Sequence, residues 1–312
     1  YAYGILAEAY GNALVANDGA ILAYGVNAAT GIEASSSTGD AIATNAGLVD
    51  ATGQYAAGIA VIAAGNAGIT NSAGGEVRAT ATDFDAFGLR AVAINDDAMI
   101  DNAGLVEVAA GFSAFGIRAA SIDGSATIDN SGSVSVTSDF AFGLLASANY
   151  GTAALVNDGD ITINPGAIIG YGGIAVGQYA EISGSGSVTV EAQNRAEGLR
   201  AFGVDAASIT SGGDVSASSL AGSAIGLFAR GYAGTASVSN AGSVYAQGAL
   251  SAYGVALIGT YASLDNTGSI ASVSDDASFA AYVVGIYGAT ASNGGSIDAE
   301  SVAGTAVGLA VF

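Results

Sequence analysis

The chain has 312 residues, 51% of them hydrophobic, and its 27 acidic residues against six basic ones give a net charge of −21. This charge argues against nucleic-acid binding, which requires Lys and Arg to neutralise phosphates, and no run approaches the roughly 18–20 apolar residues of a membrane span. Lys, His and Cys are absent, which removes the usual general base and two common nucleophiles.

A nine-residue pattern, Ala-x-(Ile/Leu/Val)-x-Asn-x-Gly-x-(Val/Ile), recurs from ALVANDGAI (13–21) to ATASNGGSI (289–297). Its asparagines are Asn17, Asn45, Asn71, Asn102, Asn130, Asn157, Asn240, Asn266 and Asn293, and two further copies carry Gly184 and Ser211 instead. Successive copies are 26 to 31 residues apart. A period of this length is typical of a repeat array, here of about eleven coils of 27–28 residues.

Each repeat contains three short segments with alternating apolar and polar residues, the pattern of a β-strand. The first surrounds Ala-x-Gly-(Ile/Leu/Val), as in AYGI (2–5); the second is Ala-x-(Ile/Leu/Val)-x-Asn; the third is typified by GSVSV (132–136). If the chain winds once per repeat, equivalent strands pair in parallel, and parallel crossovers are right-handed. The sequence therefore predicts an all-β, right-handed parallel β-helix, one continuous solenoid over residues 1–312, as an excerpt or a protomer of a longer fibre.

The asparagines share the parity of the apolar residues, as Asn102 does with Ala98 and Ile100. We therefore expect their amides to stack along an inside corner, where they satisfy one another's hydrogen bonds. Gly184 and Ser211 interrupt this column and predict a local defect, and Pro165 begins the least regular part of the array.

Three aromatic residues, Phe87, Phe115 and Phe142, occupy equivalent positions on consecutive repeats. Each of them lies two positions before an apolar residue that is expected in the core. Under strict alternation both side chains lie on the same side of the strand, so we expect the three rings to point inward and stack at a corner. A sugar-binding aromatic platform is the functional alternative.

Candidate chemistry is sparse, and no catalytic, cofactor-binding or metal-ligating residue is predicted. Glycoside hydrolysis needs two carboxylates, and the available pairs are Asp83 with Asp85, Asp96 with Asp97, and Asp275 with Asp276. All three pairs lie in polar segments between strands, as expected of solvated turn residues. The oxygen-rich turn NDGD (157–160) leaves calcium binding open.

Arginine follows the repeat glycine by two positions at Arg90, Arg118 and Arg200. Arg90 and Arg118 are expected to face outward on adjacent coils. Such a basic spot is able to bind a carboxylate-bearing glycan, or simply to pair with neighbouring acids.

The unit GI-x-A-x-A-x-G-x-A-x-V-x-N-x-G-x-I-x-A, visible in GILAEAYGNALVANDGAILA (4–23), resembles the passenger regions of large Gram-negative autotransporters and related β-strand-repeat surface adhesins. The resemblance extends over essentially the whole chain. It implies a right-handed β-helix, a place on the bacterial cell surface, and a role in adhesion, biofilm or matrix.

The sequence thus favours a non-enzymatic, extracellular structural or adhesive solenoid, part of a surface fibre formed by end-to-end stacking of coils. Its expected partners are copies of itself, end to end or laterally, and a host or matrix surface. The alternative is a carbohydrate-active or glycan-binding β-helix, either similar to a polysaccharide lyase or a segment of a phage tail fibre.

Overall fold

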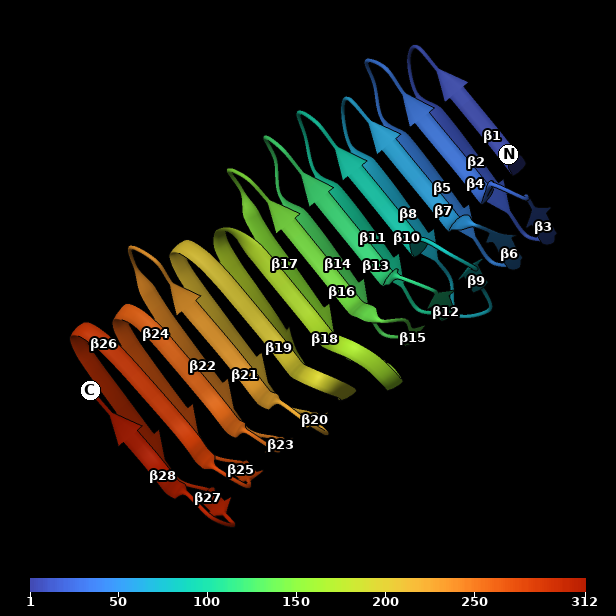
Figure 1. Ribbon diagram of the computed structural model, residues 1–312. Coiled ribbons are helices and arrows are strands. Elements are labelled where there is room, and N and C mark those ends of the chain that lie inside the picture. The colour runs from blue at the N-terminus through green and yellow to red at the C-terminus, as the bar shows by residue number, and fades with distance from the viewer. The chain divides into compact units, whose positions relative to one another are not determined.

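The computed structural model describes every residue from Tyr1 to Phe312, and all 28 of its elements are β-strands. The predicted fold class is confirmed, because the parallel strands form a right-handed β-solenoid of about eleven turns. The chain divides into two compact units, Tyr1–Leu155 and Val156–Phe312. Within each unit, successive coils lie side by side with their strands running in the same direction (Figure 1).

Unit 1 has three faces, to each of which every coil contributes one strand. Face 1 consists of β1 (Ala2–Ala9), β4 (Ala28–Ser36), β7 (Tyr55–Ala63), β10 (Ala86–Ala93), β13 (Ser113–Ser121) and β16 (Phe140–Ala148). Face 2 consists of β2 (Ala13–Asn17), β5 (Ala41–Asn45), β8 (Ala67–Asn71), β11 (Ala98–Asn102) and β14 (Ala126–Asn130). Face 3 consists of β3 (Ala20–Tyr24), β6 (Leu48–Gly53), β9 (Glu76–Ala81), β12 (Leu105–Ala110) and β15 (Ser133–Thr137). The division between the units falls within β17 (Thr152–Asn157).

Unit 2 repeats this arrangement with longer strands, several of which continue around a corner. These are β18 (Asp160–Gly184), β19 (Ser187–Ser211), β24 (Ser251–Asn266) and β26 (Ala277–Asn293). The shorter strands are β20 (Asp214–Ser219), β21 (Ser223–Gly231), β22 (Thr235–Asn240), β23 (Ser243–Gly248), β25 (Ser269–Ser274), β27 (Ser296–Ser301) and β28 (Thr305–Val311). The pairing of β18 with β19 shifts register on both sides of Ala167, just after Pro165, which cannot donate to the ladder.

Pairing places each residue beside its equivalent one coil away. In the β10–β13 pair, for example, Leu89 faces Ile117 and Arg90 faces Arg118. The core is consequently built from columns of like side chains, and Leu89 and Ile117 are fully buried. Burial of such a side chain stabilises a fold by about 1.5–3 kcal/mol.

The asparagines form hydrogen-bonded columns at an inside corner. In unit 1, Nδ2 of Asn17, Asn45, Asn71 and Asn102 each donates to Oδ1 of the next asparagine, at 2.8, 2.9, 2.8 and 2.7 Å. The same bonds join Asn240 to Asn266 and Asn266 to Asn293 in unit 2, at 2.8 and 2.7 Å. Each of these donors also reaches a carbonyl in the turn that follows, so Nδ2 of Asn45, for example, donates to Gly47 O at 3.0 Å.

The column in unit 2 is interrupted where the sequence departs from the pattern. Ser211 pairs with Asn240 in register, and Oδ1 of Asn240 is buried without a hydrogen-bond donor. Gly184 has a φ of 138°, and a Cβ added there would lie 2.0 Å from Asn157 O. Serine at position 211 therefore leaves the amide oxygen of Asn240 without a donor. At position 184 the neighbouring backbone leaves no room for a side chain.

Replacement of Asn71 by alanine should lower the free energy of unfolding by about 1–3 kcal/mol, because it leaves Oδ1 of Asn102 buried without its donor. The urea midpoint of Asn71→Ala measures the loss. Thr70→Ala is the control, since Thr70 is the exposed neighbour on the same strand, and should shift stability by less than about 0.5 kcal/mol. Equal midpoints for Asn71→Ala and the parent chain would contradict a stabilising column.

Ser211→Asn should raise the free energy of unfolding by about 1 kcal/mol, because its Nδ2 supplies the donor that Oδ1 of Asn240 lacks. Gly184→Asn should lower the melting temperature, since its Cβ meets backbone atoms. Differential scanning calorimetry of the two variants tests both directions. A stabilised Gly184→Asn variant would show that the interruption has another cause.

Candidate functional site

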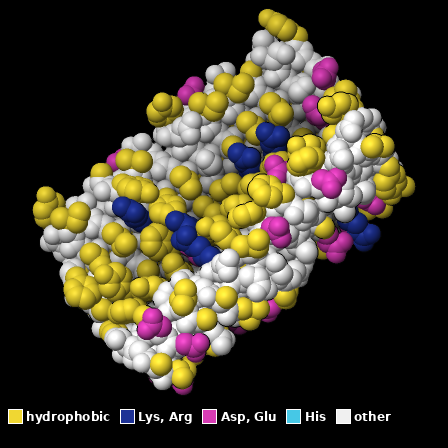
Figure 2. All heavy atoms as spheres, in the orientation of Figure 1, with side chains coloured by type: hydrophobic (Ala, Val, Ile, Leu, Met, Phe, Trp, Pro, Cys, Tyr) yellow, Lys and Arg dark blue, Asp and Glu magenta, His cyan; other side chains and the backbone are white.

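Aromatic rings stack on the outer side of face 1 in unit 1. The ring centroids of Phe87 and Phe115 are 5.0 Å apart and those of Phe115 and Phe142 are 4.6 Å apart, each pair tilted by 7°. All three side chains are half-exposed. In both units, hydrophobic side chains surround basic ones on the face turned to the viewer, with acidic side chains at the margin (Figure 2).

The prediction that Phe87, Phe115 and Phe142 point inward is wrong. Gly88 and Leu89 are consecutive and both buried, so alternation is interrupted between them and the preceding residue lies on the outer side. A Cβ on Gly88 would lie 2.4 Å from Cγ1 of Val106 on face 3 and 2.5 Å from Gly116 O. Only glycine tolerates this close approach, and the same interruption recurs at Gly116 before Ile117.

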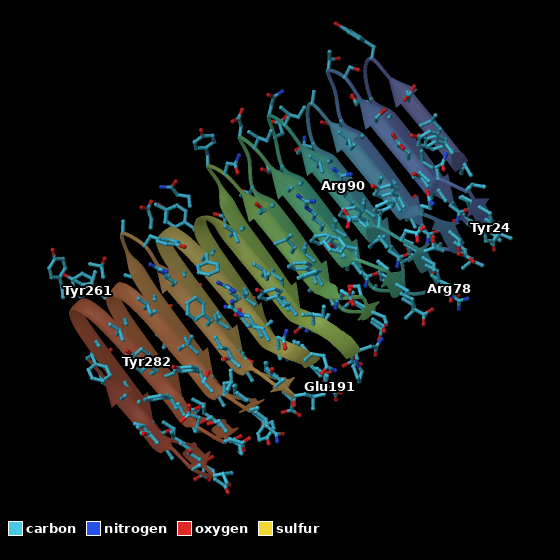
Figure 3. The ribbon with its side chains drawn as sticks, in the orientation of Figure 1. Tyr24, Arg78, Arg90, Glu191, Tyr261 and Tyr282 are labelled. Atoms are coloured by element: carbon cyan, nitrogen blue, oxygen red, sulfur yellow. The ribbon has the colours of Figure 1, made fainter.

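Two arginines lie beside the rings. Cζ of Arg90 is 5.2 Å from the centroid of Phe87, and Cζ of Arg118 is 5.6 Å from that of Phe115, distances that permit cation–π attraction. Figure 3 labels Arg90 on the outer side of face 1. Burial, followed by the neighbouring charge of Arg90, lowers the pKa of Arg118 from its ordinary value.

These two guanidinium groups lack a carboxylate partner within 4.0 Å, unlike others in the chain. Arg78 pairs with Glu76 and, at 3.1 Å, with Glu107. Nε of Arg90 and Nε of Arg118 are both buried without a hydrogen-bond acceptor. Face 1 of unit 1 therefore holds two adjacent positive charges without a direct carboxylate partner in a strongly acidic chain.

A shallow hollow of about 220 Å³ adjoins Phe87 and Arg90. It is lined by Ala28, Ala29, Thr30, Tyr55, Ala56, Ala57, Asp85, Phe87 and Arg90. Ala57 is the register partner of Phe87 in the preceding coil, so the ring column stops there and one ring face of Phe87 remains uncovered. Tyr55 stacks on Phe84 at 4.4 Å and contributes to the rim.

Glu33 lies on the same face, two coils from Arg90 in register. Burial raises the pKa of Glu33 and the negative charge of Glu8 raises it further, while Arg90 opposes both effects. Attraction to Arg90 therefore compensates only part of the cost of the buried charge on Glu33.

On face 1 of unit 2, Arg195 and Arg200 share a carboxylate partner from the same chain. Glu197 occupies the register position of the aromatic column, beside Tyr171 and Ile225. Its side chain is 1% exposed and forms ion pairs with Arg195 and, at 2.9 Å, with Arg200. This cluster was not predicted from the sequence, although two arginines within three residues of one glutamate indicate an ion-pair network.

The structure places the predicted carboxylate pairs in turns between strands, where one of the six carboxylates caps a backbone group. A side-chain oxygen of Asp83 accepts from Oγ1 of Thr82 at 3.1 Å, and Oδ1 of Asp97 accepts from the N–H of Ser125 at 2.8 Å. Residues Asp83, Asp96, Asp97, Asp275 and Asp276 are exposed, and Asp85 is half-exposed beside the hollow.

In the turn proposed for calcium, Oδ1 of Asp158 accepts from the N–H and the hydroxyl of Ser185, at 2.9 and 2.8 Å. These hydrogen bonds lower the pKa of Asp158. Across residues 1–312, no group of three or more acidic, His or Cys side chains is arranged to hold a metal ion. None of the elements is a helix with the length and apolarity to cross a bilayer.

Comparison of the chain with protein-family models, with curated proteins and with solved structures finds no match.

Glu33→Gln should raise the melting temperature at pH 7 and leave it unchanged near pH 3. Because the folded-state pKa of Glu33 is raised, its ionisation opposes folding, and this penalty is lost as the pH falls and the carboxyl group is protonated in both states. Calorimetry across this pH range measures the difference. Glu191→Gln, at an exposed glutamate (Figure 3), controls for the loss of one negative charge. A larger gain near pH 3 than at pH 7 would contradict the assignment.

Proposed function

We propose that this chain is a non-enzymatic structural or adhesive β-solenoid outside the bacterial cell, part of a surface fibre whose coils stack end to end. The observation that carries the proposal is an uncovered core column. Leu309 continues the column of Leu227, Val255 and Ala281, which are fully buried, yet Leu309 is 41% exposed. A coil of a second copy, paired in the same register, is able to cover such a surface.

The chemistry of the side chains supports a role without catalysis. The chain lacks His, Cys and Lys, and five of the six carboxylates in the predicted pairs are exposed turn residues. The polar side chains that form columns, above all the asparagines, hydrogen-bond to one another.

The surface location rests on the resemblance of the repeat unit in GILAEAYGNALVANDGAILA (4–23) to autotransporter passengers and surface adhesins. The large negative charge favours solubility and keeps neighbouring particles apart laterally. It is therefore compatible with association through the ends of the coils, where core side chains and backbone groups meet.

Sedimentation velocity and electron microscopy of the purified chain over a range of concentrations test the stacking. We expect elongated assemblies that grow with concentration, and Leu309→Lys should weaken association at least about 10-fold, because it puts a charge into the buried contact. Ile286→Lys is the matched control, since Ile286 is 72% exposed and outside the core columns. A single small species at every concentration would reject end-to-end stacking, and depolymerisation of a polysaccharide by the pure chain would reject the non-enzymatic assignment.

A further inference from the structure

We propose that the hollow beside Phe87 and Arg90 binds a carboxylate-bearing sugar residue of an acidic polysaccharide. This inference rests on the adhesive part of the proposed function and names the class of ligand. The hollow, the uncovered ring face and the unpaired guanidinium group lie together on β4, β7 and β10 of unit 1.

The first argument is charge. Arg90 and Arg118 face each other across one coil spacing, and neither has a carboxylate within 4.0 Å, although acidic residues outnumber basic ones 27 to six. The buried Nε of Arg90 has no acceptor. Arg90 as a whole is half-exposed, and a guanidinium group binds a carboxylate through two parallel hydrogen bonds, so an external carboxylate supplies the missing negative charge.

Unit 2 shows how this face accommodates a carboxylate. Glu197 occupies the register position of the aromatic column and is held by Arg195 and Arg200. The Cζ atom of Arg200 also lies 4.2 Å from the ring centroid of Phe202. An arginine that contacts both a carboxylate and an aromatic ring is thus an arrangement that this surface already forms, and unit 1 has the arginine and the ring without a carboxylate in direct contact.

The second argument is shape. The rings of Phe142, Phe115 and Phe87 form a regular stack that ends at Ala57. The next position in the stack is occupied by the hollow, whose lining includes the half-exposed Ala57. A flat ring with apolar C–H faces continues the stack there, and a pyranose ring has this form.

The remaining lining groups favour a sugar over a small inorganic anion. Asp85 lines the hollow with Tyr55, and Glu33 lies on the same face. Asp85 and the Tyr55 hydroxyl are able to accept hydrogen bonds from sugar hydroxyl groups, which a free sulfate or phosphate does not offer. A ligand with one carboxylate and several hydroxyls matches this mixture.

Isothermal titration calorimetry at pH 7 and about 0.15 M salt tests the proposal with two matched probes. One is a tetramer of β-1,4-linked glucuronic acid, and the other is the neutral tetramer of β-1,4-linked glucose. The acidic tetramer should bind with a Kd on the order of 1 mM, as expected for one sugar ring in a shallow site. The neutral tetramer should bind at least about 10-fold more weakly, because it lacks the charge-assisted hydrogen bonds.

Two variants locate the site. Arg90→Gln should weaken binding of the acidic tetramer at least about 10-fold. Ala57→Phe should abolish it while raising the melting temperature, because the new ring fills the hollow and continues the stack. Arg78→Gln is the matched control: it removes one positive charge from face 3 and should leave the affinity within about twofold.

Undetectable binding of the acidic tetramer, equal binding of both tetramers, or binding that survives Ala57→Phe would each overturn the proposal. The Leu309→Lys variant separates this result from the stacking result. Binding to that variant with the affinity of the parent chain leaves the sugar site standing even where end-to-end association fails. Stacking without sugar binding would overturn only the present inference.

Discussion

Parallel pairing in register between equivalent residues of successive coils is the constraint on which the rest of the structure depends. One winding per repeat puts Leu89 beside Ile117 and Asn71 beside Asn102. A residue type that recurs at one position of successive repeats therefore forms a column of like side chains from coil to coil. Apolar residues become a continuous core, and amides become a chain of hydrogen bonds in which each side chain satisfies the next.

Columns concentrate like groups, with opposite effects on stability. Stacked rings attract one another, but stacked charges repel. Asp101 pairs in register with Asp129, and burial together with that second carboxylate raises the pKa of Asp101. The Arg90 and Arg118 pair is the positive counterpart. A repeat protein of this kind therefore places like charges next to each other wherever two successive coils carry the same ionisable residue on the outer side.

The period and the alternation within the second strand were enough to predict the fold. In β11 the alternation is strict, and Ala98, Ile100 and Asn102 are buried while Met99 is exposed; parity therefore identifies the inner side. In β10 the same rule fails, because Gly88 and Leu89 both point inward, and it assigns Phe87 to the wrong side. The hollow was out of reach for the same reason: alignment of the Ala-x-Gly motifs puts Ala57 beside Phe87, but with Phe87 assigned to the inner side this register predicts no gap on the surface.

The asparagine columns also have a direction. Every inter-amide bond in both units runs from the Nδ2 of the earlier residue to the Oδ1 of the later one. The two ends of a column are consequently unlike: Oδ1 of Asn17 accepts from the N–H of Gly19, whereas Nδ2 of Asn293 donates to Gly295 O. One end of such a column therefore presents an amide oxygen and the other an amide N–H group, so the two ends of the column are chemically different.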